Sequence, residues 1–423
     1  MGGTDLRTFI LIVAVLAGPV LAGQTSRVTA WTNGRWFDGT RFTAIDVYSV
    51  GPRLTLKRPA RIDRRVDLAQ KFVTGAFGEA HNHNIPSPDT GATIRTYLAQ
   101  GVYYVMIQGN QPTVRAALAP TVNTPTSVDV AFANGLFTAP GGHPTALVRR
   151  NIANGGMTEV DLTDGFILAA ASTDDVDRLW GRVVRPYRPD FIKLALVYSE
   201  DREAGVPVPA QSDRYGLDPA LVAYIVRKAH GDGLRVSAHV ESARDFDIAV
   251  SGGADVIAHF PGFWPDPARI REKGTAIYEI SDAAAARAGS NHVTVVTTLG
   301  EALRTLESDS TYAARREDIL RVYRANLARL SASGVRLAVG SDQFRSTSVP
   351  EALAIARAGL LPPVALLRAL TIDTPATIFP QRAPFGLAEG APADFLVFDE
   401  DPLADISAIT RIARHVKAGE ELR

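Results

Sequence analysis

The 423-residue chain contains no cysteine. A disulfide-stapled scaffold is therefore excluded, and so is a lipoprotein cysteine behind an export signal. Any metal ion must be held by nitrogen and oxygen ligands, because thiolate sulfur is missing. If such a chain is exported, its lack of cysteine suits a bacterial periplasm or the extracellular medium.

The sequence also lacks an excess of charge, since 45 Lys and Arg residues balance 45 Asp and Glu residues. It contains no basic run with interleaved aromatic residues. Such a chain has no net field to attract nucleic acid or an anionic membrane. We therefore expect no nucleic-acid partner. The oligomeric state is left open, and a homo-oligomer is compatible with the sequence.

Long apolar runs are absent except near the N-terminus, where residues 9–22 form one. Arg7 precedes this run, and the small residues Val20 and Ala22 stand before Gly23 as in a cleavage site. The pattern predicts a signal peptide over residues 1–22 and a secreted or periplasmic protein without stable membrane association after cleavage. The alternative is an uncleaved membrane anchor, for which the run is short.

The middle of the chain alternates short apolar segments with helical periodicities. The segments that indicate strands are 72–77, 102–107, 128–133, 191–196, 235–238, 255–258, 293–297 and 336–339. Eight strands that alternate with helices over about 310 residues predict an α/β fold of the (β/α)8 TIM-barrel type. A doubly wound sheet is the rival interpretation, but no Gly-x-Gly-x-x-Gly turn follows the first segment, which counts against a dinucleotide-binding fold.

Both ends of the chain are rich in residues that favour strands. Turn signals stand at Asn33-Gly34 and Asp38-Gly39, and a similar β-rich region closes the chain. We predict one small composite β-sandwich domain from residues 23–72 and 384–423. The barrel would then occupy residues 73–383.

Ionisable side chains coincide with the predicted strand ends, where a (β/α)8 barrel carries its chemistry. They are His81, His83, Lys193, His239, His259 and Asp342. His81 and His83 are two residues apart, so on a strand both rings point to one face. Each residue alone has an ordinary explanation: a strand-end histidine is often structural, Asp342 could cap a helix, and Lys193 could extend to a strand edge. Together at one barrel mouth they predict a metal centre.

This pattern resembles the metal-dependent amidohydrolase superfamily, in particular its prolidase-like and imidazolonepropionase-related branch. The similarity covers nearly all of the chain after the predicted signal peptide. Besides the ligand-type residues, it rests on segments 190–193, 229–239, 253–259 and 371–406. Two positions depart from the family pattern: Glu79 stands where aspartate is common, and Ala258 stands where an acidic residue often precedes the histidine.

The resemblance implies a centre with two divalent metal ions, for which zinc is the default with nitrogen and oxygen ligands. His81 and His83 would bind the more buried ion, and His239 and His259 the more exposed one. Lys193, carboxylated on its amine, would bridge the two ions, since a carbamate offers two oxygens.

The resemblance also implies roles in catalysis and substrate binding. Asp342 would hold the buried ion and act as the catalytic proton shuttle. His143, in a Gly-Gly-His-Pro segment after the third strand, and Tyr198, just beyond the fourth, are expected to contact substrate.

The implied function is a secreted hydrolase that cleaves an amide (C–N) bond of a dipeptide, an N-acyl amino acid or a cyclic amide with a metal-activated hydroxide. A mononuclear aminohydrolase of the deaminase kind has His-x-x-Glu in the fifth strand and no strand-four lysine, whereas this chain has His239-Val-Glu241 and Lys193. A lactonase or phosphotriesterase-type esterase shares the same ligands and stays open as an alternative. A non-catalytic binding protein is disfavoured, because such relatives lose ligands and this chain keeps all six.

Overall fold

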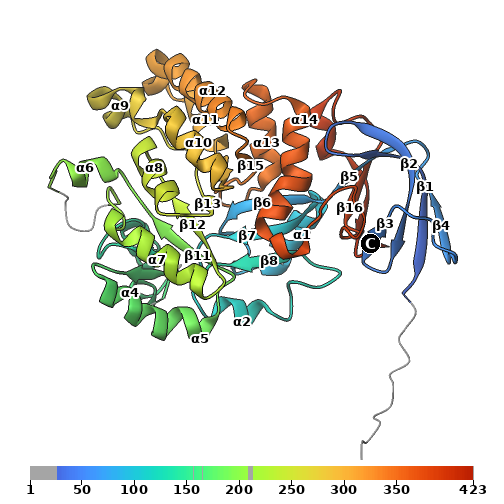
Figure 1. Cartoon of the computed structure of the whole chain (residues 1–423), viewed down its shortest axis with the longest axis horizontal. Coiled ribbons are helices and arrows are strands. Elements are labelled where there is room, and N and C mark those ends of the chain that lie inside the picture. Colours follow the sequence, from blue (N-terminus) through green and yellow to red (C-terminus); the bar gives the residue numbers. More distant parts are fainter. Residues whose placement is uncertain (1–25, 156, 164, 208–212, 423) are drawn as a thin grey trace, which may run out of the picture.

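The computed structural model describes residues 26–155, 157–163, 165–207 and 213–422. The predicted signal peptide lies outside these ranges. The described residues form a β-rich domain from both chain ends and a larger α/β barrel (Figure 1). Within these ranges no helix has both the length and the apolar character needed to cross a membrane.

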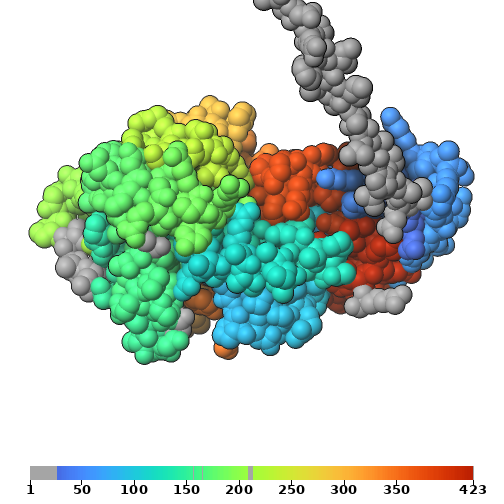
Figure 2. Space-filling view, turned by 90° about the horizontal axis from the view of Figure 1, so that it is seen from below, coloured from blue at the N-terminus to red at the C-terminus, as the bar shows by residue number. Residues whose placement is uncertain are grey.

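One eight-stranded sheet combines strands from both ends of the chain, in the order β18-β17-β16-β5-β1-β2-β3 with β4 paired to β1. The strands are β1 Val28–Phe37, β2 Phe42–Val50, β3 Arg53–Thr55, β4 Arg64–Asp67, β5 Phe72–Gly75, β16 Phe395–Phe398, β17 Ile412–Lys417 and β18 Glu420–Glu421. The two ends meet where β5 pairs antiparallel with β16, and Figure 2 shows the blue and red segments together at one end of the molecule.

The core of this β domain is aromatic. The Phe395 ring lies 4.9 Å from the ring centroids of both Trp31 and Trp36, and all three side chains are buried. Burial of such large apolar surfaces is the main term that stabilises a small sheet. Because Phe395 comes from the C-terminal segment and the tryptophans from the N-terminal one, this cluster holds the two chain ends together.

The two turn signals of the N-terminal region have different outcomes. The chain reverses at Asp38-Gly39, where the Asp38 carboxylate accepts hydrogen bonds from the backbone N–H groups of Thr40 and Arg41 at 2.8 and 2.9 Å. Asn33-Gly34 is a bulge within β1 and not a turn, since the pairing with β2 shifts between Trp31 and Gly34. A bulge uses the same left-handed backbone as a turn, here at Asn33 with φ of 55°, so the two cannot be told apart from sequence.

The barrel strands confirm the (β/α)8 prediction. They are β6 Phe77–Asn82, β7 Val102–Ile107, β8 Asp129–Phe132, β11 Phe191–Ala195, β12 Arg235–His239, β13 Val256–Ile257, β14 Thr294–Val296 and β15 Arg336–Ala338. Neighbours from β6 to β8 and from β11 to β15 pair in parallel. Ala80 N–H donates to the Val339 carbonyl at 2.9 Å and thereby closes β6 against the strand-eight segment, while Asp190 N–H donates to the Phe132 carbonyl at 2.8 Å beside β8.

The first predicted strand is wrong, whereas the other seven lie within two residues of observed strands. Residues 72–77 straddle β5, which belongs to the β domain, and the first residue of β6, which starts the barrel. Two short strands, β9 Leu136–Thr138 and β10 Ile167–Ala169, were not predicted, because three residues give no readable alternation. β9 pairs with β11 through Phe137 and Leu194, and β10 pairs with β9. The proposed domain limits at residues 72 and 384 stay predictions.

Helices cover the outside of the barrel (Figure 1). The α-helices are α1 Thr90–Ala99, α2 Val114–Leu118, α3 Thr145–Ala153, α4 Thr173–Leu179, α5 Arg185–Tyr187, α6 Ser199–Glu203, α7 Pro219–Gly231, α8 Ala243–Ser251, α9 Pro267–Lys273, α10 Asp282–Ser290, α11 Gly300–Ser308, α12 Arg316–Ala332, α13 Ser348–Arg357, α14 Pro363–Arg368 and α15 Thr374–Ile378. α8 shows how sequence sets their limits: a capping box of Ser242 and Asp245 starts it, and Phe246 and Val250 on one face are buried. Such a cap contributes about 1 kcal/mol.

Candidate metal centre

His81 and His83 stand at the C-terminal end of β6, the barrel end where chemistry is expected. The Nδ1 atom of His81 lies 2.8 Å from the Ala258 carbonyl oxygen, and that of His83 lies 3.2 Å from the Gly109 carbonyl oxygen. A carbonyl oxygen only accepts, so each Nδ1 carries the hydrogen in the neutral ring. Each Nε2 is therefore left with its lone pair, the form that binds a metal ion.

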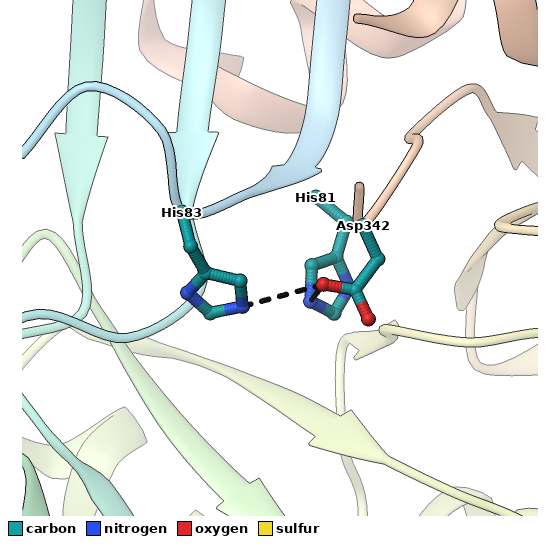
Figure 3. Close-up of side chains that lie close together, drawn as sticks. All are labelled: His81, His83 and Asp342. Carbon is teal, nitrogen blue, oxygen red and sulfur yellow. Dashed lines mark ion pairs between the residues drawn. The ribbon is translucent and has the colours of Figure 1, made fainter. Parts of the chain in front are cut away.

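Asp342 brings a carboxylate to the same two nitrogens. Its Oδ1 atom lies 3.4 Å from Nε2 of His81 and 3.4 Å from Nε2 of His83 (Figure 3). The ligand atoms of the three residues all lie within 4.8 Å of one another. Three ligands at about 2.1 Å from one tetrahedral ion lie about 3.4 Å apart, so this arrangement fits a single divalent ion.

His239 and His259 extend the cluster from β12 and β13. The His259 ring centroid lies 4.3 Å from that of His81 and 4.4 Å from that of His239, and Nε2 of His259 is 3.9 Å from Oδ2 of Asp342. Nδ1 of His259 lies 3.2 Å from the Thr298 hydroxyl, and Nε2 of His239 lies 3.1 Å from a Glu241 carboxylate oxygen. When these nitrogens carry hydrogen, Nε2 of His259 and Nδ1 of His239 are free to bind a second ion.

Lys193 is the member of the cluster whose burial costs the most free energy when its amine is charged. It lies in β11 with 2% of its surface exposed, and among the described residues its Nζ atom has no hydrogen-bond partner. A buried ammonium without a partner is costly, and burial lowers the pKa of Lys193 to about 7. Its neutral amine is thus accessible at neutral pH. This is the form that adds carbon dioxide to give a carbamate, so the residue fits the implied bridge.

The histidines of the cluster have the protonation state that a metal ligand requires. Burial lowers the pKa of His83 to about 4 and holds the pKa values of His81, His239 and His259 well below the usual range. These imidazoles are therefore neutral at pH 7, as coordination requires. Burial raises the pKa of Asp342 to about 7, an effect that the nearby Lys193 opposes.

Glu79, which departs from the family pattern, joins β6, which carries His81, to the segment after β15 that carries Asp342. Its carboxylate is fully buried and accepts hydrogen bonds from the backbone N–H and hydroxyl of Ser341, each at 2.9 Å, and from the His81 N–H at 3.1 Å. Ser341 directly precedes Asp342. Glu79 thus positions His81 and Asp342 relative to each other, a role that sequence reasoning missed.

Asn82 and Asn84 were also missed, although they alternate with the two histidines. The Asn82 amide donates to the Ser341 hydroxyl at 3.0 Å, and its oxygen accepts from the Asn84 N–H at 2.7 Å. Asn84 in turn donates to the Gln343 carbonyl at 2.9 Å and accepts from the Arg345 N–H at 3.1 Å. The histidine motif is thus hydrogen-bonded to the loop that follows β15.

The two predicted substrate-contacting residues lie in different surroundings. The His143 ring centroid is 4.5 Å from that of His239, so the structure brings His143 to the cluster. The Tyr198 hydroxyl lies 3.4 Å from the Tyr278 hydroxyl, and the Arg269 guanidinium stacks 4.1 Å from the Tyr198 ring centroid. Their contact with a substrate stays a prediction.

Comparison with known proteins agrees with this architecture. The model of the Amidohydrolase family matches residues 197–422. A prolidase complexed with N-methylphosphonate-L-proline is 18% identical with a TM-score of 0.67, covering 94% of this chain and 99% of that chain. A Xaa-Pro dipeptidase with methionine in its active site is 17% identical with a TM-score of 0.68, covering 94% and 100%. An ochratoxinase from A. niger is 15% identical with a TM-score of 0.70, covering 94% and 95%.

At these identities the solved structures establish a shared fold. No curated protein sequence matches the chain.

Proposed function

Because this chain belongs to the amidohydrolase family and is a hydrolase of carbon–nitrogen bonds, we propose that it cleaves an amide bond of a small substrate at a pair of divalent metal ions. The substrate would be a dipeptide, an N-acyl amino acid or a cyclic amide. The observation that carries the proposal is the burial of Lys193, whose Nζ atom has no hydrogen-bond partner within the part of the chain that the structure describes and lies within electrostatic reach of His81, His83 and Asp342.

The donor set divides into two groups. His81 and His83 would hold one ion, His239 and His259 the other, and the carboxylated Lys193 would contribute one oxygen to each. Zinc is the default for these ligands. Such ions, when bound, lower the pKa of a water molecule and polarise the substrate carbonyl.

Asp342 would transfer the proton. It would also hold the more buried ion, and its carboxylate would accept the proton of the attacking water and pass it to the leaving amine. His143, a neutral imidazole beside His239, would donate a hydrogen bond to a substrate oxygen. Tyr198 is proposed as a second substrate contact.

The test is Lys193→Ala, assayed with a panel of dipeptides and N-acyl amino acids after metal reconstitution in bicarbonate. We expect this variant to lose hydrolysis, and added short carboxylic acids to restore part of it by replacing the carbamate oxygens. Lys228→Ala, on the outer helix α7, is the matched control and should retain activity. Full activity of unrescued Lys193→Ala would contradict the bridging role.

We also propose that residues 1–22 are removed during export and that the mature enzyme is secreted or periplasmic. The support is the apolar run behind Arg7 and the small residues before Gly23.

A further inference from the structure

Two exposed aromatic residues stand close in sequence to ligands of the metal centre. Phe344, two residues beyond Asp342, is 73% exposed, and Trp264, five residues beyond His259, is 48% exposed. Nε2 of His259 and Oδ2 of Asp342 are 3.9 Å apart, so the loops that carry the two aromatic residues leave the barrel at adjoining points. Both loops therefore border the mouth in which a substrate must lie.

The loop that carries Phe344 is fixed on both sides of that residue. Asn84 donates to the Gln343 carbonyl at 2.9 Å and accepts from the Arg345 N–H at 3.1 Å. The backbone is left-handed at Asp342, with φ of 47°, and at Arg345, with φ of 61°. Non-glycine residues adopt this region only when surrounding contacts impose it. Phe344 is thus presented to solvent by a constrained backbone.

The loop that carries Trp264 is constrained in the same way. The Gly262 N–H donates to the Glu241 carbonyl at 3.0 Å, and the Pro265 carbonyl accepts from the Tyr312 hydroxyl at 2.7 Å. Between them, the Phe263 ring stacks on His259 with centroids 3.9 Å apart and an interplanar angle of 20°. Phe263, which directly precedes Trp264, thus covers the ring of a predicted metal ligand.

Two of the three cations of the neighbouring helix α9 are paired with a carboxylate. Arg269 and Lys273 both pair with Asp201, the latter at 2.7 Å. The Arg269 guanidinium also stacks on the Tyr198 ring. Single exposed apolar side chains are common on protein surfaces, but apolar rings held beside a catalytic centre are typical of a ligand-binding surface.

We propose that Phe344 and Trp264 determine substrate specificity by binding an aromatic or bulky apolar group next to the scissile amide bond. This inference rests on the proposed function and specifies its substrate class. Aromatic rings attract one another in offset or edge-on arrangements and bury apolar area when they meet, so each contact should contribute roughly tenfold in kcat/KM.

The test uses substrates in matched pairs that differ only in a phenylalanyl or alanyl side chain. We expect the wild-type enzyme to prefer the phenylalanyl member, and Phe344→Ala and Trp264→Ala each to reduce that ratio of kcat/KM by roughly tenfold. Leu56→Ala, an exposed apolar residue of the β domain at 37%, should leave the ratio as it is in the wild type.

Tryptophan fluorescence gives a readout that does not depend on hydrolysis. The chain has four tryptophans, of which Trp31, Trp36 and Trp180 are at most 2% exposed, so acrylamide quenching reports mainly on Trp264. We expect 3-phenylpropionate to protect Trp264 from acrylamide and propionate not to do so. Phe344→Ala should weaken this protection by roughly tenfold in ligand concentration.

The outcomes separate the two proposals. Hydrolysis without aromatic preference, together with unprotected Trp264, would overturn the specificity proposal and leave the proposed function standing. Protection of Trp264 without hydrolysis of any amide would support the aromatic site and contradict the proposed function. If both alanine variants changed the oligomeric state in size-exclusion chromatography and slowed all substrates equally, the aromatic residues would be subunit contacts and the specificity proposal would be wrong.

Discussion

Glu79 is the residue whose replacement tests the architecture of the centre most sharply. Its carboxylate accepts hydrogen bonds from the Ser341 N–H, the Ser341 hydroxyl and the His81 N–H at 2.9, 2.9 and 3.1 Å, in a fully buried position. Glu79→Ala leaves these donors without an acceptor. A buried unpaired donor costs about 1–3 kcal/mol, so we expect this variant to lose at least about 3 kcal/mol in free energy of unfolding.

Glu79→Gln is the matched variant that keeps the shape of the side chain. Its carbonyl oxygen can still accept from both backbone N–H groups, and the Ser341 hydroxyl can turn to accept from its NH2 group. We expect a loss of about 1 kcal/mol. Glu307→Ala, an exposed position on α11, serves as the control and should stay within about 0.5 kcal/mol of the wild type.

The assay is denaturant unfolding followed by circular dichroism, with metal titration of each folded variant. Since Glu79 positions His81 and the segment before Asp342, we expect Glu79→Ala to weaken metal binding by roughly 10- to 100-fold, as is usual when a residue that holds metal ligands in place is removed. An alanine variant as stable as Glu307→Ala, with undiminished metal affinity, would refute the assignment of Glu79 as the link between the two strands.

Two further predictions concern pH and processing. Burial raises the pKa of Glu351 from 4.5 to about 7. A carboxyl group with a raised pKa in the folded state stabilises the fold below pH 4.5, and this stabilisation is lost as the pH rises to about 7. Between these two pH values the free energy of unfolding of the wild type should therefore fall by up to about 3 kcal/mol relative to that of Glu351→Gln. Unfolding curves at several pH values measure the difference, and a constant difference would contradict the prediction. Export from a bacterial host should yield a mature chain that starts at Gly23, which intact-mass spectrometry checks; a retained N-terminus would instead favour the membrane anchor.

Seven of the eight barrel strands could be predicted because they are short, mostly apolar runs, which can be recognised without knowledge of their neighbours. The prediction failed where the sheet to which a strand belongs depends on the strand with which it pairs. Phe72 and Val73 are as apolar as the residues of β7, but they belong to β5, which pairs with β1 and β16 of the β domain. Nothing within residues 72–77 shows that the chain passes from one sheet to the other there.

The residues of the candidate metal centre divide in the same way, into those that a local sequence pattern identifies and those whose contacts depend on distant segments. His239 and His259 could be predicted to lie together because each follows a strand that can be recognised in the sequence, whereas His81 and His83 were predicted from their His-x-His spacing; the structure brings all four together. The contacts of Glu79 with Ser341 could not be predicted, since they connect residues 262 positions apart in the chain. Sequence patterns predict which side chains reach the mouth, whereas the hydrogen bonds that fix those side chains depend on the closed barrel.

We propose that these histidines hold two divalent ions with Lys193 between them. The most direct measurement is the metal content of the purified mature protein, expressed with bicarbonate and compared with Lys193→Ala. We expect about two ions per wild-type chain and a clear loss in the variant. About one ion per chain, unchanged in the variant, would favour the mononuclear aminohydrolase, and no bound metal even after reconstitution would contradict the proposed metal centre.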